Sequence, residues 1–221
     1  MSCMQLQMTA ILQYNNLTIE LFDDSVYVIN STDSPTKYDV IYNEDNYAGH
    51  DFPTRHAIKV FKSGQLIKSA ILLGAGGATG INSDAAFVDN DNLIIRCSNQ
   101  VFSLTLPELD KNWQVKPDWA TCFSIHKYQD TYIVHGETSI SRIDRMGNIL
   151  WSHGGADIFV CLYEGTPFEM HDDFISMTDF NGSKYKIDHD GNSISYVESD
   201  YHKQKPITVL LKSSKPWWKF W

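Results

Sequence analysis

A ten-residue pattern built around a glycine occurs three times in the sequence, and this internal repeat constrains the fold more than any other feature. In each copy a basic residue lies five positions before the glycine, a β-branched residue lies four before it, and an amide residue follows it. Alternating apolar and polar residues predict a half-buried strand, and a glycine followed by Asn or Gln supplies the positive φ of a tight hairpin turn. The repeat therefore predicts β-hairpins. The three copies are Ile58–Ile67, Ser141–Leu150 and Tyr185–Ile194.

A fourth, degenerate copy at Val101–Leu109 makes the repeat periodic. The core positions of the four copies are 44, 39 and 44 residues apart, which is the length of one four-stranded propeller blade. Two further strand-like runs, separated by short polar turns, lie upstream of the hairpins, so each unit is predicted to contain four strands. The core positions are Val60, Leu104, Ile143 and Ile187.

The run Ile143–Trp151 shows a strand, a turn with glycine, and a second strand ending in tryptophan. In this pattern the units resemble the quinoprotein-like and WD-repeat β-propeller families, over roughly residues 36–197. No tryptophan follows Gly64 or Gly191 at the same spacing. The resemblance implies an all-β propeller, and we expect one domain over residues 1–221.

The number of blades depends on how the two ends of the chain are used. We expect a small propeller of about five four-stranded blades, closed by strands from both termini, because closure removes exposed sheet edges. A four-bladed ring and an open arc of blades are the alternatives. The candidate closing strands are Leu17–Phe22, Val26–Ile29 and Pro206–Leu211.

The chain carries 27 acidic and 18 basic residues, for a formal net charge of −9. This charge argues against a nucleic-acid partner, because phosphate binding depends on clustered Lys and Arg. It is compatible with a solvated acidic surface or with a face that meets a basic partner.

The four cysteines, Cys3, Cys97, Cys122 and Cys161, have no C-x-x-C spacing, which argues against a zinc or redox site. The first eight residues lack the basic start and apolar run of a signal peptide, and no run approaches the ~20 apolar residues of a membrane span. We therefore expect a cytoplasmic protein without a membrane partner.

Three local motifs suggest chemistry, and each is better interpreted as a loop or turn. The glycine-rich run Gly74–Gly80 lacks the following helix and the Gly-Lys-Ser/Thr of a phosphate loop. The segment Asp188–Asn192 resembles the start of a calcium loop, but Ser199 stands where the bidentate carboxylate is needed. The cluster His171–Asp173 lies at a turn that other repeats fill with unrelated residues. We expect no metal, no cofactor and no catalytic residue.

The loops at one end of the predicted blades are rich in acids and aromatic residues, a composition suited to binding a basic protein. We expect a non-enzymatic protein-binding module, a monomer that forms a heterodimer with its partner. Small acidic immunity proteins that neutralise a basic toxin, such as a nuclease, are similar to this chain in size and charge. The predicted partner-binding residues are Asp118, Trp119, Glu137, His153, Asp157, Tyr163, Glu164, Asp179, Glu198, Asp200 and Tyr201.

Two alternatives remain open at this point. The first is an enzyme or small-ligand binder with a polar site at the ring centre, using His135, His153 or Asp157. The second is an assembly scaffold. The aromatic tail, residues 215–221, is expected to pack on the propeller or on a partner; its Trp and Lys residues are also compatible with weak anchoring at a membrane interface.

Overall fold

The computed structural model describes residues 9–43, 52–161 and 166–200, and within these ranges the chain forms β-strands and connecting loops. The strands form four sheets, called A to D here in chain order. Sheet A has five strands, and its short edge strand β3 runs parallel to β5 while all other pairs are antiparallel. In spatial order sheet A contains β1 (Thr9–Tyr14), β2 (Leu17–Asp23), β4 (Thr54–Lys62), β5 (Gln65–Gly74) and β3 (Val40–Tyr42).

Sheets B, C and D are four-stranded antiparallel meanders whose spatial order follows the chain, as in the blades of a β-propeller. The hairpins predicted from the glycine repeat are confirmed as β4–β5, β12–β13 and β16–β17, and the degenerate copy forms β8–β9. Sheet B contains β6 (Ala86–Asp89), β7 (Asn92–Cys97), β8 (Gln100–Thr105) and β9 (Lys111–Val115). Sheet C contains β10 (Cys122–Tyr128), β11 (Thr131–Gly136), β12 (Ser139–Asp144) and β13 (Ile149–Gly154). Sheet D contains β14 (Phe168–Met170), β15 (Ile175–Thr178), β16 (Lys184–Ile187) and β17 (Ser193–Val197).

Successive sheets stack on one another, so the inner strands are buried on both faces. In β7, Leu93 packs toward sheet A while its neighbour Ile94 packs toward sheet C. In β11, Val134 faces sheet B and Ile133 faces sheet D. Because side chains alternate between the two faces of a strand, a strand covered on both sides needs apolar residues at consecutive positions. This requirement explains the continuous apolar runs of β7 and β11.

A tryptophan of one sheet lies on the turn glycine of the next. The indole N–H of Trp113 in β9 donates to the main-chain oxygen of Arg145 at 2.7 Å, and a Cβ built on Gly147 would lie 2.9 Å from its ring. Trp151 in β13 repeats both contacts with His189, at 3.0 Å, and with Gly191. The glycine and the tryptophan of the repeat are therefore the two halves of one joint between neighbouring sheets.

The joint between sheets A and B uses a different residue. Tyr42 of β3 donates its hydroxyl to the main-chain oxygen of Leu109 in the β8–β9 turn, at 2.8 Å. Leu109 has a φ of +59° and so adopts the left-handed conformation that glycine adopts in the other turns. Tyr42 from a parallel edge strand thus replaces the tryptophan that does not follow Gly64.

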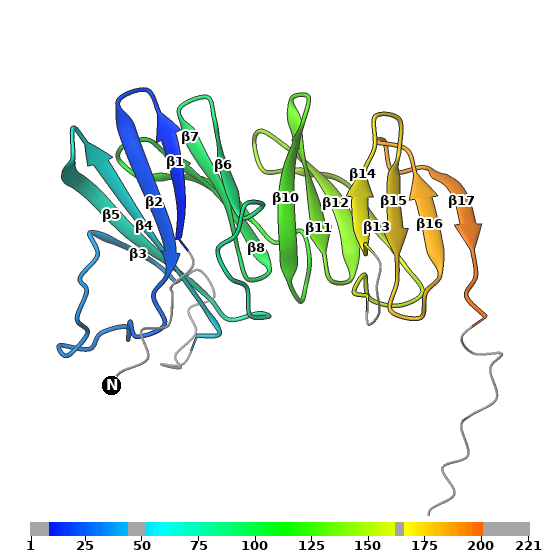
Figure 1. Ribbon diagram of the computed structural model, residues 1–221, viewed down its shortest axis with the longest axis horizontal. Coiled ribbons are helices and arrows are strands. Elements are labelled where there is room, and N and C mark those ends of the chain that lie inside the picture. Colours follow the sequence, from blue (N-terminus) through cyan, green and yellow to red (C-terminus); the bar gives the residue numbers. More distant parts are fainter. Residues whose placement is uncertain (1–8, 44–51, 162–165, 201–221) are drawn as a thin grey trace, which may run out of the picture.

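Figure 1 shows the four sheets side by side along the longest axis of the molecule, with sheet A at one end and sheet D at the other. The outer face of sheet A is covered by the side chains of Tyr27 and Phe52, which pack on Ile71 and Leu73. On the opposite end every residue of β17 is exposed.

The expected use of the termini is only partly met. Leu17–Phe22 is a strand, but it pairs within sheet A rather than with C-terminal strands. Val26–Ile29 is not a strand, because Tyr27 is buried against the face of sheet A instead of joining a ladder. The run Pro206–Leu211 lies outside the described residues. The described part of the chain contains four sheets, where about five blades were expected.

Candidate functional site

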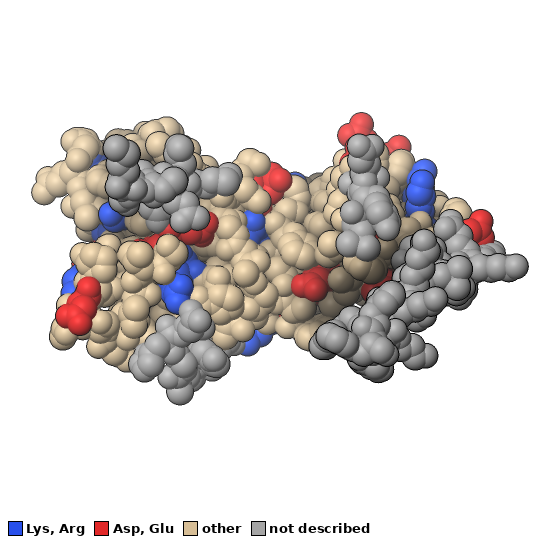
Figure 2. All heavy atoms as spheres, turned by 60° about the horizontal axis from the view of Figure 1, so that its bottom comes forward, with Lys and Arg blue, Asp and Glu red and all other residues tan. Residues whose placement is uncertain are grey.

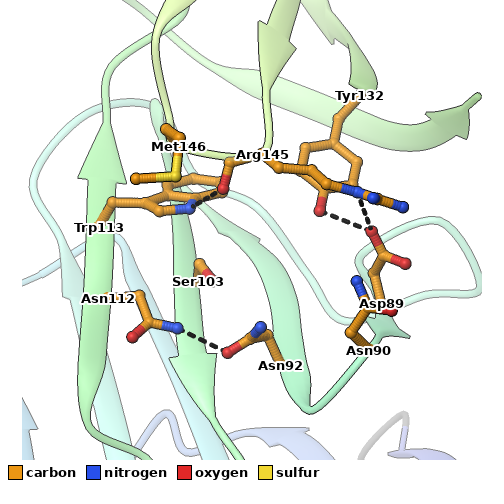
Figure 3. Close-up of a pocket in the computed structure, with 9 residues that line it drawn as sticks. All are labelled: Asp89, Asn90, Asn92, Ser103, Asn112, Trp113, Tyr132, Arg145 and Met146. Carbon is orange, nitrogen blue, oxygen red and sulfur yellow. Dashed lines mark hydrogen bonds and ion pairs between the residues drawn. The ribbon is translucent and has the colours of Figure 1, made fainter. Parts of the chain in front are cut away.

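A groove of about 360 Å³ opens between sheets B and C, at the end of the sheets that carries the tryptophan–glycine joints. The β6–β7 turn forms one wall and the β12–β13 turn forms the other, while β8 and β9 form the floor (Figure 3). The lining is largely polar, with three asparagines among nine residues. The residues are Asp89, Asn90, Asn92, Ser103, Asn112, Trp113, Tyr132, Arg145 and Met146.

Asp89 is the charged centre of this groove, and only 3% of its surface is exposed. Its carboxylate accepts hydrogen bonds from Lys127 Nζ at 2.6 Å and from Tyr132 Oη at 2.8 Å, and it lies 3.4 Å from Arg145 Nε. Burial raises the pKa of Asp89, but the hydrogen bonds and the nearby cations outweigh it, so the pKa lies below its usual range. Asp89 is thus ionised at neutral pH.

Arg145 links the two walls of the groove. Its guanidinium lies between Asp89 and Asp130, with Nη2 at 3.0 Å from the carboxylate of Asp130. Its main-chain oxygen accepts the indole N–H of Trp113, as Figure 3 shows. On the floor, the amide of Asn112 donates to Asn92 Oδ1 at 2.6 Å. These contacts hold acceptor and donor groups in place around an open space.

The sequence did not point to this groove, because its residues come from five strands and two turns spread over some 60 residues of the chain. By sequence alone, Asp89–Asp91 is a polar turn between two strand-like runs and Trp113 ends a hairpin unit, and neither pattern indicates a binding site. The groove lies at the end of the sheets opposite to the loops that were expected to bind a partner: the β11–β12 turn begins at Gly136, at the other end of β12 from Arg145.

Two of the predicted partner-binding acids are buried, and their carboxylates are engaged inside the protein. Asp118 accepts hydrogen bonds from the main-chain N–H groups of Ala120, Thr121, Thr138 and Ser139. Asp179 accepts one from Ser183 N at 2.8 Å and one from Tyr185 Oη at 2.7 Å. Both carboxylates therefore hold loops in place, whereas their positions in acidic loop segments predicted that they would contact a partner.

The remaining predicted residues differ in exposure. Trp119 is 79% exposed, and Glu198 and Asp200 are also exposed. Glu137, His153 and Asp157 are half-buried, and Asp157 accepts a hydrogen bond from Asn181 Nδ2 at 2.6 Å. Tyr163, Glu164 and Tyr201 lie outside the described residues.

The loops that carry these residues are joined to one another by main-chain hydrogen bonds. Gly77 N donates to Ala120 O at 2.9 Å, Glu137 N donates to Thr121 O at 2.8 Å, and Phe159 N donates to Glu137 O at 2.7 Å. Consecutive inter-sheet connections thus form a continuous platform, called the loop platform here: residues 75–80, 117–121, 136–139 and 156–159.

The alternative site at the ring centre depends on His135, His153 and Asp157. His135 is buried between the rings of Phe123 and Phe168, and its Nε2 lies 3.1 Å from Phe159 O. Burial lowers the pKa of His135 to about 4, so the imidazole is neutral at pH 7. The contacts of His135 hold it in the aromatic core, and those of Asp157 hold a loop.

A chain of contacts between Asp23, His56 and Thr79 has the order of a nucleophilic triad. His56 Nδ1 lies 2.6 Å from Asp23 Oδ1, and His56 Nε2 lies 3.0 Å from Thr79 Oγ1. However, His56 is completely buried, and Thr79 Oγ1 also accepts the main-chain N–H of Ser98 at 3.0 Å. Thr79 Oγ1 thus contacts both His56 of sheet A and Ser98 of sheet B, so this chain of contacts joins the two sheets.

The calcium-like motif folds into a closed turn. Asp188 Oδ1 accepts the N–H groups of Asp190 and Asn192, and Asn192 Nδ2 donates to Asp188 Oδ2. Asp144 makes the same three contacts in sheet C, with Met146 and Asn148. The turn interpretation of this motif is confirmed.

The other two motifs also lie in connections. Gly74–Gly80 leads from the end of β5 into the connection to β6, and His171–Asp173 lies between β14 and β15. Among the described residues, no three His, Cys, Asp or Glu side chains gather closely enough to hold a metal ion. Within these same residues, no helix has the length and the apolar character needed to cross a bilayer.

Comparisons with known proteins find similarity at the level of structure only. No family model matches the chain, and a search of curated proteins finds no similar sequence. Among solved structures, BamB from Moraxella catarrhalis is 17% identical with a TM-score of 0.45, covering 65% of this chain and 44% of BamB. The AfRom2 CNH domain is 10% identical with a TM-score of 0.45, covering 87% of this chain and 54% of that one. The chain thus spans about half the length of these two structures.

A third similar structure is the computationally designed Ika4 protein. It is 11% identical with a TM-score of 0.48, and the match covers 85% of this chain and 93% of Ika4. Taken by itself, the present chain is an all-β protein of repeated four-stranded antiparallel sheets, consistent with a β-propeller.

Proposed function

We propose that this protein is a non-enzymatic module that binds a basic protein through its loop platform. The observation that carries the proposal is the exposure of Trp119, 79% of whose surface is open to solvent. Large aromatic side chains on rigid loops are the commonest hot spots of protein interfaces, because they bury much area at little cost in conformational entropy.

The loop around Trp119 is held in one conformation by its neighbours. Asn99 Nδ2 donates to Trp119 O at 3.1 Å, and Asp118 Oδ1 accepts the N–H of Ala120 at 2.8 Å. A side chain presented by a pre-organised loop loses little further freedom on binding, which favours affinity.

The net charge of −9 supports a basic partner. On the face shown in Figure 2, acidic and basic side chains are interspersed on a largely uncharged surface. We therefore assign the charge a role in steering a basic partner toward the protein, and Trp119 the main contribution to the contact itself. In its most specific form, the proposal is a cytoplasmic immunity protein that masks the active site of a basic toxin, such as a nuclease.

The proposal is tested by identifying a stoichiometric partner by affinity capture and measuring its binding to the purified protein. Trp119→Ala should weaken binding at least about tenfold without changing the melting temperature, as expected for a hot spot. Reversing two exposed charges next to the platform, at the same end of the sheets, Glu198→Lys with Asp200→Lys, should slow association mainly at low salt.

Glu108→Lys in the β8–β9 turn is the control, because it changes one exposed charge at the other end of the sheets. Undiminished binding by the Trp119→Ala variant would overturn the proposed contact. A partner that is acidic, or binding that does not depend on salt, would overturn the proposed charge complementarity.

We further propose that the sheets form an open arc rather than a closed ring. The outer face of sheet D carries the exposed side chains of Lys184 and Lys186, and the outer face of sheet A is already covered by Tyr27 and Phe52. In an array of stacked repeats, the outer face of each terminal repeat is polar or is covered by other residues. Amide hydrogen exchange tests this arrangement: the N–H groups of β17 that point away from β16 should exchange rapidly, whereas a closing strand would protect them.

A further inference from the structure

In the joint between sheets C and D, an arginine side chain occupies the position that corresponds to the groove between B and C. Arg142 in β12 donates from Nε to Thr131 Oγ1 at 2.9 Å and from Nη1 to the main-chain oxygen of His189 at 2.9 Å. The same Nη1 donates to Asp190 Oδ1 at 2.9 Å. The guanidinium also lies over the ring of Tyr128, with its central carbon 5.1 Å from the ring centre.

Strand register identifies Ser103 as the residue of sheet B equivalent to Arg142. Arg142 pairs with Trp151, and Ser103 pairs with Trp113. Both positions directly precede an irregularity in the ladder, so the two backbones have the same local form. The side chain of serine has five fewer heavy atoms than that of arginine, and the space that the guanidinium occupies in one joint is open in the other.

The groove keeps acceptors that correspond to those around Arg142. Asn92 is equivalent to Thr131 in register, since each begins the second strand of its sheet. The main-chain oxygen of Arg145 is equivalent to that of His189, because each accepts the joint tryptophan. A carbonyl oxygen has two lone pairs, and His189 uses both, for Trp151 and for Arg142. The groove between sheets B and C thus has the same kinds of acceptor as the joint between sheets C and D, but it has no side chain equivalent to that of Arg142.

The carboxylate lies on opposite sides of the two joints. Asp190, on the turn of sheet D, corresponds to Met146, whereas Tyr128 corresponds to Asp89. Each joint therefore has a carboxylate beside this position, Asp190 in one and Asp89 in the other. In the groove, the charges of Lys127 and Arg145 are balanced by those of Asp89 and Asp130, so an added guanidinium meets no net positive charge from these four groups.

We propose that the groove between sheets B and C binds a guanidinium group, from an arginine side chain of a polypeptide or from a small guanidino compound. The guanidinium would occupy the space that Arg142 occupies in the next joint, with Asn92, the main-chain oxygen of Arg145 and Asp89 as its acceptors. This site does not depend on the proposed function, because the loop platform lies at the other end of the sheets.

The direct test uses the full chain and three probes: N-acetyl-arginine-N-methylamide, free L-arginine, and the neutral N-acetyl-citrulline-N-methylamide. Chemical-shift changes of the Asn92 and Asn112 amides and of the Trp113 indole N–H report binding. We expect saturation by an arginine probe in the millimolar range and at least about tenfold weaker binding of the citrulline probe, because only a charged donor gains the charge-assisted hydrogen bond. Comparing blocked with free arginine distinguishes a polypeptide side chain from a small compound. An equal response to citrulline, or no response to any probe, would overturn the proposal.

The complementary test supplies the guanidinium from within the chain. Ser103→Arg should fill the groove as Arg142 fills the next joint, abolish the response to arginine and raise the melting temperature by about 2–4 °C over Ser103→Met. Arginine binding that survives in Ser103→Arg contradicts the proposal, as does a Ser103→Arg protein less stable than Ser103→Met. Asn92→Ala removes one acceptor without filling the space, and it should weaken arginine binding several-fold. Unchanged affinity in Asn92→Ala would also count against the site.

Discussion

The indole ring of Trp113 packs directly on Gly147 of the next sheet, and the contact leaves no room for a side chain at position 147. A Cβ at position 147 would lie 2.9 Å from the ring, and the φ of +84° at this residue disfavours any side chain. This contact is repeated between Trp151 and Gly191. It connects the local turn sequence to the stacking of the sheets.

Replacing Gly147 by alanine should therefore carry two costs. The positive φ costs about 1–2 kcal/mol, and displacing the Trp113 ring costs about 1–3 kcal/mol more. The matched control is Gly64→Ala, because Gly64 has a φ of +78° but nothing within 4 Å of the added Cβ. Urea unfolding measures both free energies. Equal losses in the two variants would show that the contact with Trp113 does not contribute to stability.

Removing the Arg142 side chain should open a second groove between sheets C and D. Arg142→Ala loses donors to Thr131, His189 and Asp190, and we expect a loss of about 2–3 kcal/mol in the free energy of unfolding. The control is Lys186→Ala at the same position of sheet D, which has an exposed side chain and should lose less than about 1 kcal/mol. If the losses are equal, the guanidinium contacts contribute nothing beyond an exposed lysine.

The stability of the protein should decrease as the pH falls from about 6.5 to about 4, because His135 is neutral and buried in the folded state. Its pKa in the folded protein is about 4, whereas an unfolded histidine titrates near 6.5, so the unfolded state takes up the proton first. The stabilisation is complete above pH 6.5, and roughly 2–3 kcal/mol is lost by pH 4. His135→Phe should flatten this part of the pH profile, measured by urea unfolding at pH 4, 5, 6 and 8. A variant whose profile is parallel to that of the wild type would contradict this assignment.

Asp89 should control the more acidic part of the same profile. Its pKa in the folded protein is below that of an unfolded aspartate, so its contribution is complete above about pH 4 and is lost as the pH falls through the folded value. Asp89→Asn should lower stability at pH 7 by about 2–4 kcal/mol, because the amide keeps one acceptor oxygen where Lys127 and Tyr132 use two, and the cations of Lys127 and Arg145 lose their counter-charge. The variant should also depend less on pH below 4. A difference between variant and wild type that stays constant from pH 2 to pH 7 would exclude an ionised Asp89 as the cause.

The features that could be predicted from the sequence are those in which the interacting groups are neighbours in the chain. The Asp144 turn is an example: its carboxylate, the two N–H groups that it accepts and the amide of Asn148 lie within five residues. Alternation of apolar residues likewise predicted the hairpins and the four-stranded unit. Turn chemistry and strand alternation depend on residues that are adjacent in the chain, so the sequence predicts them without knowledge of how the sheets pack.

The candidate sites depended on contacts between residues that are distant in the chain. Asp118 has the same local surroundings as an exposed loop acid, and only the approach of Thr138 and Ser139 buries it. The small side chain of Ser103 leaves an open space, and this space becomes a groove because Asp89 and Arg145, from neighbouring sheets, line it. The sequence by itself determined the strands, the turns and the repeat, because a few adjacent residues set each of them. The tertiary structure decided which acids are buried and where an open space remains, because both depend on how one sheet packs against the next.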